Sequence, residues 1–227
     1  MIFDLQESDD SAPGAFVRPN SAFSMAKVDL NSKDWQSEVE GLEAIVRLII
    51  YHQDIILSDI ETLVRSLVHE CKNLRSQVTR AALQTLVILF WALGMYDLSN
   101  LPILCWSILI LNYGIANNNY LQNIIGSKTN LIKSIDSVIT ILLVKIADTN
   151  RFIRADSSAA LESMTENLTI HKAVTLLHNN GTRHKNIPAK TTTASILGNI
   201  VKSIGEDKFV LMAMESMDSY SKVLWLF

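Results

Sequence analysis

Four stretches of this 227-residue chain share one pattern, a short polar turn followed at once by an amphipathic helical segment. The helical segments align at Val39, Val78, Ile153 and Ala189, so the pattern recurs after 39, 75 and 36 residues. Self-similarity at about 40 residues is typical of helical-pair repeats of the HEAT kind, whose neighbouring pairs must stack to bury their apolar faces. The chain is therefore predicted to be an all-α, HEAT-repeat α-solenoid, and solenoids commonly serve as scaffolds for binding.

Composition supports this fold class and narrows the functions. Hydrophobic residues make up 48% of the chain, which is enough for a sizeable core, while 8 Gly and 4 Pro are few for many short strands. The formal net charge of −3 argues against a broadly basic, nucleic-acid-binding surface. Binding to an acidic partner would depend on the local placement of Lys and Arg.

Motifs for catalysis or metal binding are missing from the sequence. It contains no Gly-rich phosphate loop, nucleophile elbow or zinc-protease motif, and its five His show no ligand spacing. Cys71 and Cys105 form no disulfide framework, which favours a reducing compartment, and the acidic N-terminus does not resemble a signal peptide. We therefore expect a non-enzymatic, cytoplasmic protein that needs no cofactor or metal and binds no small-molecule substrate.

The repeat domain is expected to span 21–205, between a flexible lead-in at 1–20 and a tail or partial further repeat at 206–227. Gly181 and Gly205 stand at predicted helix ends, where a left-handed residue is common. The four predicted pairs are 21–30 with a helix from Trp35, about 58–72 with 76–93, 131–147 with 152–167, and 170–177 with 189–204, the last interrupted at 179–181.

The long step between the second and third turns contains an uncharged apolar stretch, 94–130. Its densest part, 101–111, is shorter than the ~20 residues of a membrane span and contains Pro102 and Ser107. Three interpretations remain open: a poorly packed insertion or altered splice product, a degenerate extra helical pair, or membrane contact. The stretch also separates the second turn from the third, which must be adjacent if the turns are to form a continuous edge.

Several motifs resemble those of a known family. They are the turn at 74–82, the opening at 31–35 with 40–42, and the segment 152–154 with 159–161 and 167–169. Together they resemble a TOG domain, most closely that of the crescerin family of TOG array regulators of axonemal microtubules, with CLASP-type domains next. The resemblance covers about 22–205, interrupted by 95–130. TOG domains of this type carry six repeats, so the present array is shortened.

This resemblance implies a paddle of stacked repeats whose turns bind αβ-tubulin and regulate microtubule growth, with the cytoskeleton and the ciliary axoneme or basal body as locations. An exposed tryptophan flanked by Arg and Lys is also a typical hot-spot composition. A monomer is expected, without nucleic-acid or membrane contact. The residues that match the tubulin-binding turns are Lys33, Trp35, Arg75, Ser76, Asn150, Arg151, Arg154, Lys185, Asn186 and Lys190.

Each of these residues also has a purely structural interpretation. Trp35 could be a half-buried residue between helices, Arg75 could cap the preceding helix or pair with Glu70, and the remaining cations could be solvated charges. For the whole domain, the alternative is a generic HEAT scaffold that grips another protein's helix in its concave face without binding tubulin. A protein anchored to membranes by 101–111 is a third possibility.

Overall fold

The computed structural model describes residues 14–94 and 134–205, and every regular element in these ranges is helical. Most of the predicted lead-in, the uncharged stretch after residue 94 and the predicted tail lie outside the described residues. The interpretations of 101–111 therefore stay untested. None of the described helices is long and apolar enough to cross a membrane.

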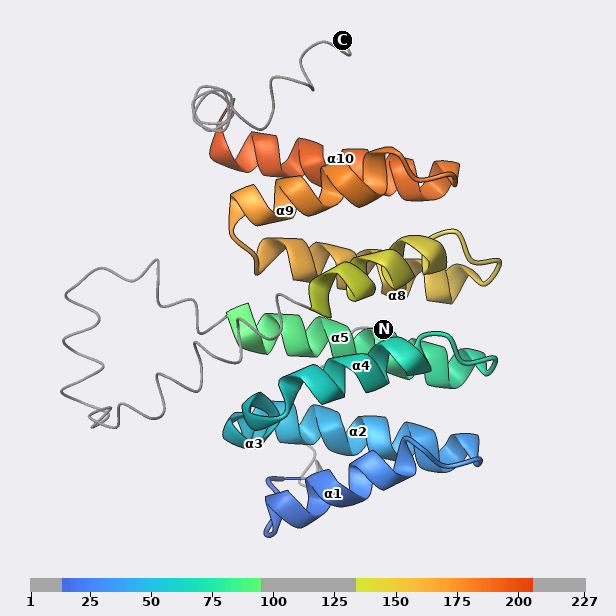
Figure 1. Cartoon of the computed structure of the whole chain (residues 1–227), viewed down its shortest axis with the longest axis vertical. Helices are drawn as coiled ribbons and strands as arrows, with labels where there is room; N and C mark the ends of the chain where they lie inside the picture. The colour runs from blue at the N-terminus through green and yellow to red at the C-terminus, as the bar shows by residue number, and fades with distance from the viewer. Residues whose placement is uncertain (1–13, 95–133, 206–227) are drawn as a thin grey trace, which may run out of the picture.

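The described helices form pairs that stack along one axis, so the prediction of an all-α solenoid is confirmed (Figure 1). In each pair a first helix ends in a polar turn and a second helix returns antiparallel to it. The first helices are α1 (Pro19–Asp29), α4 (Ile60–Glu70), the helical residues 134–145, and α9 (Ile170–Leu176) continued by the π-helix η2 (Leu177–Thr182). The second helices are α2 (Trp35–Tyr51), α5 (Ser76–Gly94), α8 (Arg151–Glu166) and α10 (Ile187–Ile204).

The core lies between the helices of each pair and between neighbouring pairs. Apolar residues spaced three or four apart on both helices are buried, as the amphipathic pattern predicts. Leu63 and Leu67 of α4 are at most 1% exposed, and so are Leu83 and Leu86 of α5. Burial of this kind stabilises by about 1.5–3 kcal/mol per large aliphatic side chain.

The second and third repeats pack directly against each other, although 95–133 separate them in the sequence. Arg80 of α5 donates from Nε to Oδ2 of Asp156 on α8 over 2.7 Å, and the Ser163 hydroxyl donates to the Val87 carbonyl over 3.1 Å. The second and third turns were expected to be kept apart by the stretch between them. They are far apart only along the sequence, because the buried faces of α5 and α8 meet in space.

An additional helix, α3 (Gln53–Ser58), lies between the first and second repeats, and the sequence pattern did not predict it. As a result α4 begins at Ile60 and not at Ser58. Asp59 interrupts the helix between them with φ of −134°. Its carboxylate pairs with Lys27 Nζ of α1 over 2.9 Å, a tertiary contact that local periodicity does not reveal.

The break predicted at 179–181 is wrong, because the chain continues through it as the π-helix η2. Gly181 is buried inside this helix and serves close packing: an added Cβ would lie 2.9 Å from Cβ of Thr193 on α10. Gly205 ends α10 with a positive φ of 85°, as predicted for a glycine at a helix end, although its ψ of 145° is not that of a left-handed helical residue. The helix after η2, α10, begins at Ile187, two residues before the predicted start at 189, because Pro188 favours the first turn of a helix.

Candidate functional site

The four polar turns lie along one edge of the solenoid, at the right in Figure 1. Each of them directly precedes a second helix, so equivalent positions of successive repeats form a row. We call this row the turn edge and define it as residues 31–35, 72–76, 147–152 and 183–187. All the predicted site residues except Arg154 and Lys190 fall in these ranges, and those two lie in the first turns of α8 and α10.

One hydrogen bond recurs in all four turns and fixes their shape. A side chain accepts from the backbone N–H two residues later, and that residue immediately precedes the second helix. This is the geometry of an Asx-type turn, which prepares the chain to enter a helix. The acceptor and donor pairs are Ser32 Oγ with Asp34 (3.1 Å), Asn73 Oδ1 with Arg75 (2.9 Å), Asp148 Oδ1 with Asn150 (2.9 Å) and His184 Nδ1 with Asn186 (3.3 Å).

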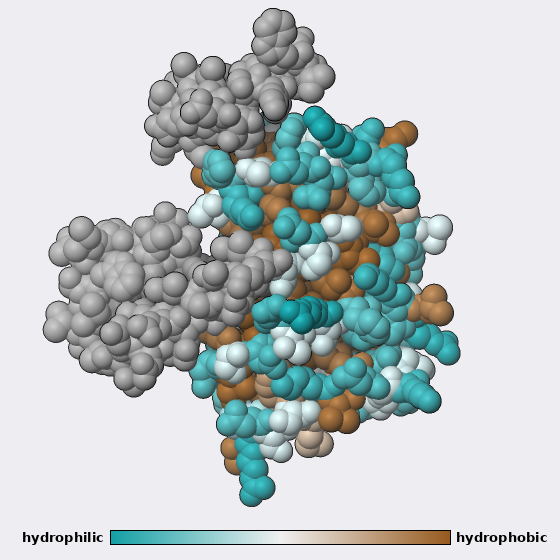
Figure 2. Space-filling model, in the orientation of Figure 1, coloured by the Kyte–Doolittle hydropathy of each residue, from teal (hydrophilic) through white to brown (hydrophobic). Residues whose placement is uncertain are grey.

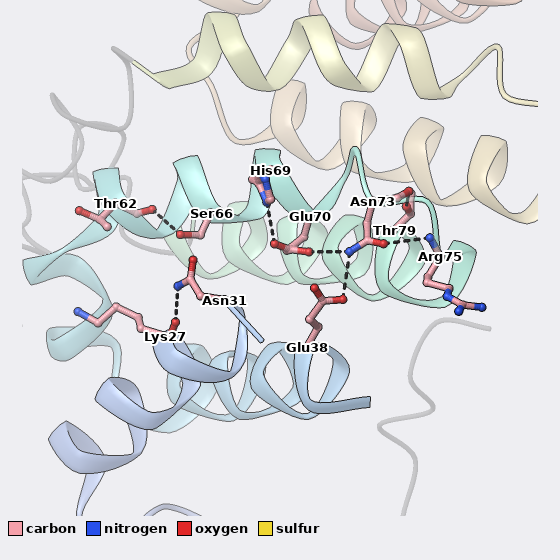
Figure 3. Close-up of polar contacts among 10 residues, drawn as sticks. All are labelled: Lys27, Asn31, Glu38, Thr62, Ser66, His69, Glu70, Asn73, Arg75 and Thr79. Carbon is pink, nitrogen blue, oxygen red and sulfur yellow. Dashed lines mark hydrogen bonds and ion pairs between the residues drawn. The ribbon is translucent and has the colours of Figure 1, made fainter. Parts of the chain in front are cut away.

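Asn73 is the central residue of the second turn (Figure 3). Besides accepting from Arg75, its amide Nδ2 donates to Glu38 Oε2 at 3.0 Å and to Glu70 Oε2 at 3.1 Å. The backbone carbonyl of Asn73 accepts from the Thr79 hydroxyl at 2.9 Å. Because Glu38 belongs to α2 and Glu70 to α4, this one side chain ties the second turn to the first repeat.

The side chain of Arg75 extends away from this network in Figure 3 and is exposed. The buried Glu70 carboxylate contacts Asn73 and His69 Nδ1, the latter at 2.9 Å, so the suggested pairing of Arg75 with Glu70 is wrong. Within the described residues no side-chain partner satisfies Arg75. Its guanidinium is therefore available to another molecule, and Ser76 next to it is exposed as well.

In the first turn, Lys33 is exposed and Asp34 caps α2 by accepting from the N–H groups of Gln36 and Ser37, each at 3.4 Å. Trp35 is half-buried and packs against the core, so the expectation of an exposed tryptophan is wrong. The indole still presents part of its surface at the turn edge. Trp35 therefore packs between helices, as the structural interpretation has it, and also offers part of its surface for binding.

The third turn separates residues that hold it from residues that face outward. Asn150 caps α8 by accepting from the Phe152 N–H at 2.9 Å. Arg154 is half-buried, and its Nη1 donates to the carbonyls of 148–149, both at 2.9 Å. Arg151 is exposed, and its guanidinium lies 4.6 Å from the centre of the Phe152 ring. Arg151 is therefore the cation of this turn best placed to meet a partner.

The fourth turn has a similar division of roles. Asn186 is half-buried and occupies the N-cap position of α10, and its N–H is bound by His184. Lys185 and Lys190 are exposed on either side of it. His184 is half-buried and acts as an acceptor in the turn, so it has a structural role there.

Exposed apolar side chains at the turn edge were missed by the sequence reasoning. Leu74 is fully exposed, Ile187 is 75% exposed and Phe152 is 48% exposed. Hydrophobic residues are visible at this edge in Figure 2. Leu74, Phe152 and Ile187 could have been identified from the sequence, because they are large apolar residues in a polar turn or at a helix start and lie outside the buried i, i+3, i+4 stripe. Trp35 completes a set with one large apolar residue per turn.

The two described residues with shifted pKa values, Asp59 and Cys71, do not point to a catalytic group at the turn edge. Burial raises the pKa of the Cys71 thiol, behind the second turn, to about 12, so the thiol stays protonated and is a poor nucleophile. In the part of the chain that the structure describes, no cluster of His, Cys, Asp and Glu could hold a metal ion. What the edge offers is cations beside apolar side chains, a composition suited to protein binding.

No family model matches the chain. It is 30% identical over 193 residues to TOG array regulator of axonemal microtubules protein 1 of Mus musculus, covering 85% of this chain and 9% of the relative. The protein of that name from Homo sapiens is 30% identical over 169 residues, 74% of this chain and 8% of the relative. Crescerin-like protein che-12 of Caenorhabditis elegans is 22% identical over 183 residues, 80% of this chain and 12% of the relative.

Among solved structures, a designed armadillo repeat protein in complex with the peptide (KR)4 has a TM-score of 0.28 and 16% identity, covering 79% of this chain and 82% of its own. A computationally designed armadillo repeat protein for modular peptide recognition has a TM-score of 0.27 and 14% identity, covering 78% and 81%. Likeness at these scores carries no argument, and the fold rests on the helices described above.

The curated relatives thus match most of this chain, which spans only about a tenth of their length. The match extends on both sides of the uncharged stretch, since 85% coverage exceeds what either described part could supply alone. The resemblance predicted from the turns is confirmed: over most of its length the chain is a homologue of crescerin-family TOG array regulators of axonemal microtubules.

Proposed function

We propose that this chain is a non-enzymatic tubulin-binding module that uses the turn edge to bind αβ-tubulin. In this proposal it takes part in regulating microtubule growth at the cytoskeleton, with the ciliary axoneme or basal body as its site of action. The names of the relatives, regulators of axonemal microtubules, support this assignment.

The observation that carries the proposal is the continuity of the turn edge. A binding surface made of several turns works only if the repeats stack in order. The direct packing of α5 on α8, with Arg80 bonded to Asp156, provides this between the second and third turns. A row of four turns on one edge can engage one large partner at several points at once.

The chemistry of the row suits an acidic partner. Although the chain carries a net charge of −3, the turn edge and the helix starts beside it present exposed cations. Such local complementarity steers association and sets orientation. Each turn also carries one large apolar side chain that can be desolvated in a complex: Trp35, Leu74, Phe152 or Ile187. The proposed contact cations are Lys33, Arg75, Arg151, Lys185 and Lys190.

Other predicted site residues act in this proposal by shaping the edge. The side chains of Asn150 and Arg154 make hydrogen bonds that hold the third turn. In the fourth turn the side chain that does so is His184, which accepts from the backbone N–H of Asn186. Substituting them would disturb the turns themselves, so loss of binding in such variants would not identify a contact. Arg75 and Arg151 are the sharper probes, because their side chains make no described hydrogen bond.

The test is co-elution of the purified chain with αβ-tubulin in size-exclusion chromatography at low and moderate salt. Arg75→Glu with Arg151→Glu should abolish co-elution. The matched control is Arg18→Glu with Lys202→Glu, which makes the same change in net charge at two exposed positions away from the turn edge. The control should retain co-elution, because the partner is expected to meet only the turn edge.

Two results would contradict the proposal. A monodisperse, helical wild-type chain that never co-elutes with tubulin would leave the generic HEAT scaffold as the better account. Equal loss in both double variants would show that net charge, and not the turn edge, governs the interaction.

A further inference from the structure

An open cleft lies between α8 and α10, at the end of these helices that adjoins the turn edge. In the preceding repeats α2 packs on α5 and α5 on α8, whereas α10 packs mainly on η2. The missing side chain at Gly181 lets Thr193 of α10 approach η2 closely. Between α10 and α8 an open cleft remains.

This cleft has a volume of about 530 Å³. Small-molecule and side-chain pockets commonly fall between about 300 and 1,000 Å³, so it can take one or two protein side chains. Its walls are the first turns of α8 and α10, which places its mouth between the third and fourth turns. Residues that line it include Ile146, Arg154, Ala155, Ile187, Pro188 and Thr191.

The lining combines an apolar wall with one fixed cation. Ile146 is 2% exposed and forms part of the apolar lining, while Ile187 is 75% exposed at the mouth, beside Pro188. Arg154 is held in place because its Nη1 donates to the carbonyls of 148–149. Among the described residues no carboxylate pairs with this guanidinium, so Nε and Nη2 can still donate to an acceptor.

We propose that the cleft between α8 and α10 is a subsite of the turn edge that receives an apolar side chain of αβ-tubulin flanked by a carboxylate. The apolar side chain would lie against Ile146 and Ile187, and the carboxylate would accept from Arg154. This inference rests on the proposed function.

Charge complementarity is the reason for choosing an acidic segment. A guanidinium with a fixed orientation binds a carboxylate through two parallel hydrogen bonds, which gives direction as well as strength. Exposed Arg151, Lys185 and Lys190 around the mouth add positive charge. A basic or wholly apolar segment would leave the remaining N–H groups of Arg154, on Nε and Nη2, without an acceptor in a desolvated site, which is costly.

The test fills the cleft without changing any charge. Ala155→Trp and, independently, Thr191→Trp place an indole at the mouth, and both positions are exposed in the free chain. Ala194→Trp is the matched control, because Ala194 is exposed on α10 but does not line the cleft. Affinity for αβ-tubulin is measured by fluorescence anisotropy at low and moderate salt, with helical content checked by circular dichroism.

Both cleft-filling variants should bind roughly tenfold more weakly or worse, by about the same factor at both salt concentrations, because steric exclusion is not screened. The control should stay within about twofold of wild type. Wild-type affinity in Ala155→Trp and Thr191→Trp, beside lost binding in Arg75→Glu with Arg151→Glu, would overturn the subsite and leave the proposed function intact. If the wild-type chain binds no tubulin, the proposed function fails and the subsite with it.

Discussion

Asn73→Ala should destabilise the chain more than any other single substitution of a polar residue in the turns. Asn73 supplies the acceptor for the Arg75 N–H and the donor for Glu38 and for Glu70. The Glu70 side chain is 3% exposed, so it cannot replace the lost amide with bulk water. Of its described partners only His69 would remain.

The expected loss follows from two terms. Leaving a nearly buried charged acceptor short of one hydrogen bond costs about 1–3 kcal/mol. Losing the side-chain acceptor that prepares the helix start adds roughly 1 kcal/mol. We therefore expect unfolding free energy to fall by about 2–4 kcal/mol, measured by urea denaturation followed by circular dichroism.

Two comparison variants make the reasoning sharp. Asn31→Ala removes an exposed hydrogen bond of 2.7 Å to the Lys27 carbonyl and should cost no more than about 0.5 kcal/mol. Asn73→Asp keeps the acceptor for Arg75 but places a third carboxylate beside Glu38 and Glu70, so it should be at least as harmful as Asn73→Ala. Adding Glu38→Gln should recover part of the Asn73→Asp loss. A stability for Asn73→Ala within about 0.5 kcal/mol of wild type would refute this account of the second turn.

The remaining predictions concern packing and ionisation away from the turn edge. Gly181→Ala should lower the unfolding free energy by about 1–3 kcal/mol in thermal or urea denaturation, since its methyl group would lie 2.9 Å from Cβ of Thr193; an unchanged stability would show that η2 and α10 can move apart at no cost. Cys71 should resist maleimide in the native chain, because burial raises its pKa to about 12, and should react on unfolding; rapid native labelling of the Cys71 peptide in mass spectrometry would contradict its burial. Partial burial acts to raise the pKa of Asp59, but hydrogen bonds, one of them from Lys27, and the Lys27 charge outweigh it and leave the pKa below 3.8. A lowered pKa in the folded state stabilises above the unfolded value, so this contribution should be lost as pH falls below about 4, and Asp59→Asn should lose less stability than wild type over that range; equal acid sensitivity would show that Asp59 contributes nothing.

The second helices could be predicted from the sequence because their signals are local. Polar residues of the turns, followed by an amphipathic stripe, place the starts of α2, α5 and α8 within one or two residues. The same local chemistry brought the predicted site residues to one edge, since a solenoid aligns equivalent turns.

What the sequence did not reveal depends on contacts between distant residues. Asp59, at the interruption between α3 and α4, pairs with Lys27 of α1, and Gly181, in the π-helix, lies against Thr193 of α10. Direct packing of α5 on α8 could not be predicted either, because the stretch between them obscures the repeat period. Half-burial of Trp35 is likewise set by the core beneath it.

Hydrogen–deuterium exchange of the full chain, alone and with αβ-tubulin, tests the central claim most directly. The account predicts that tubulin slows exchange at 31–35, 72–76, 147–152 and 183–187 together, with the rest of the described helices little changed. Slowed exchange confined to the opposite ends of the helices, or none at saturating tubulin, would contradict binding through the turn edge.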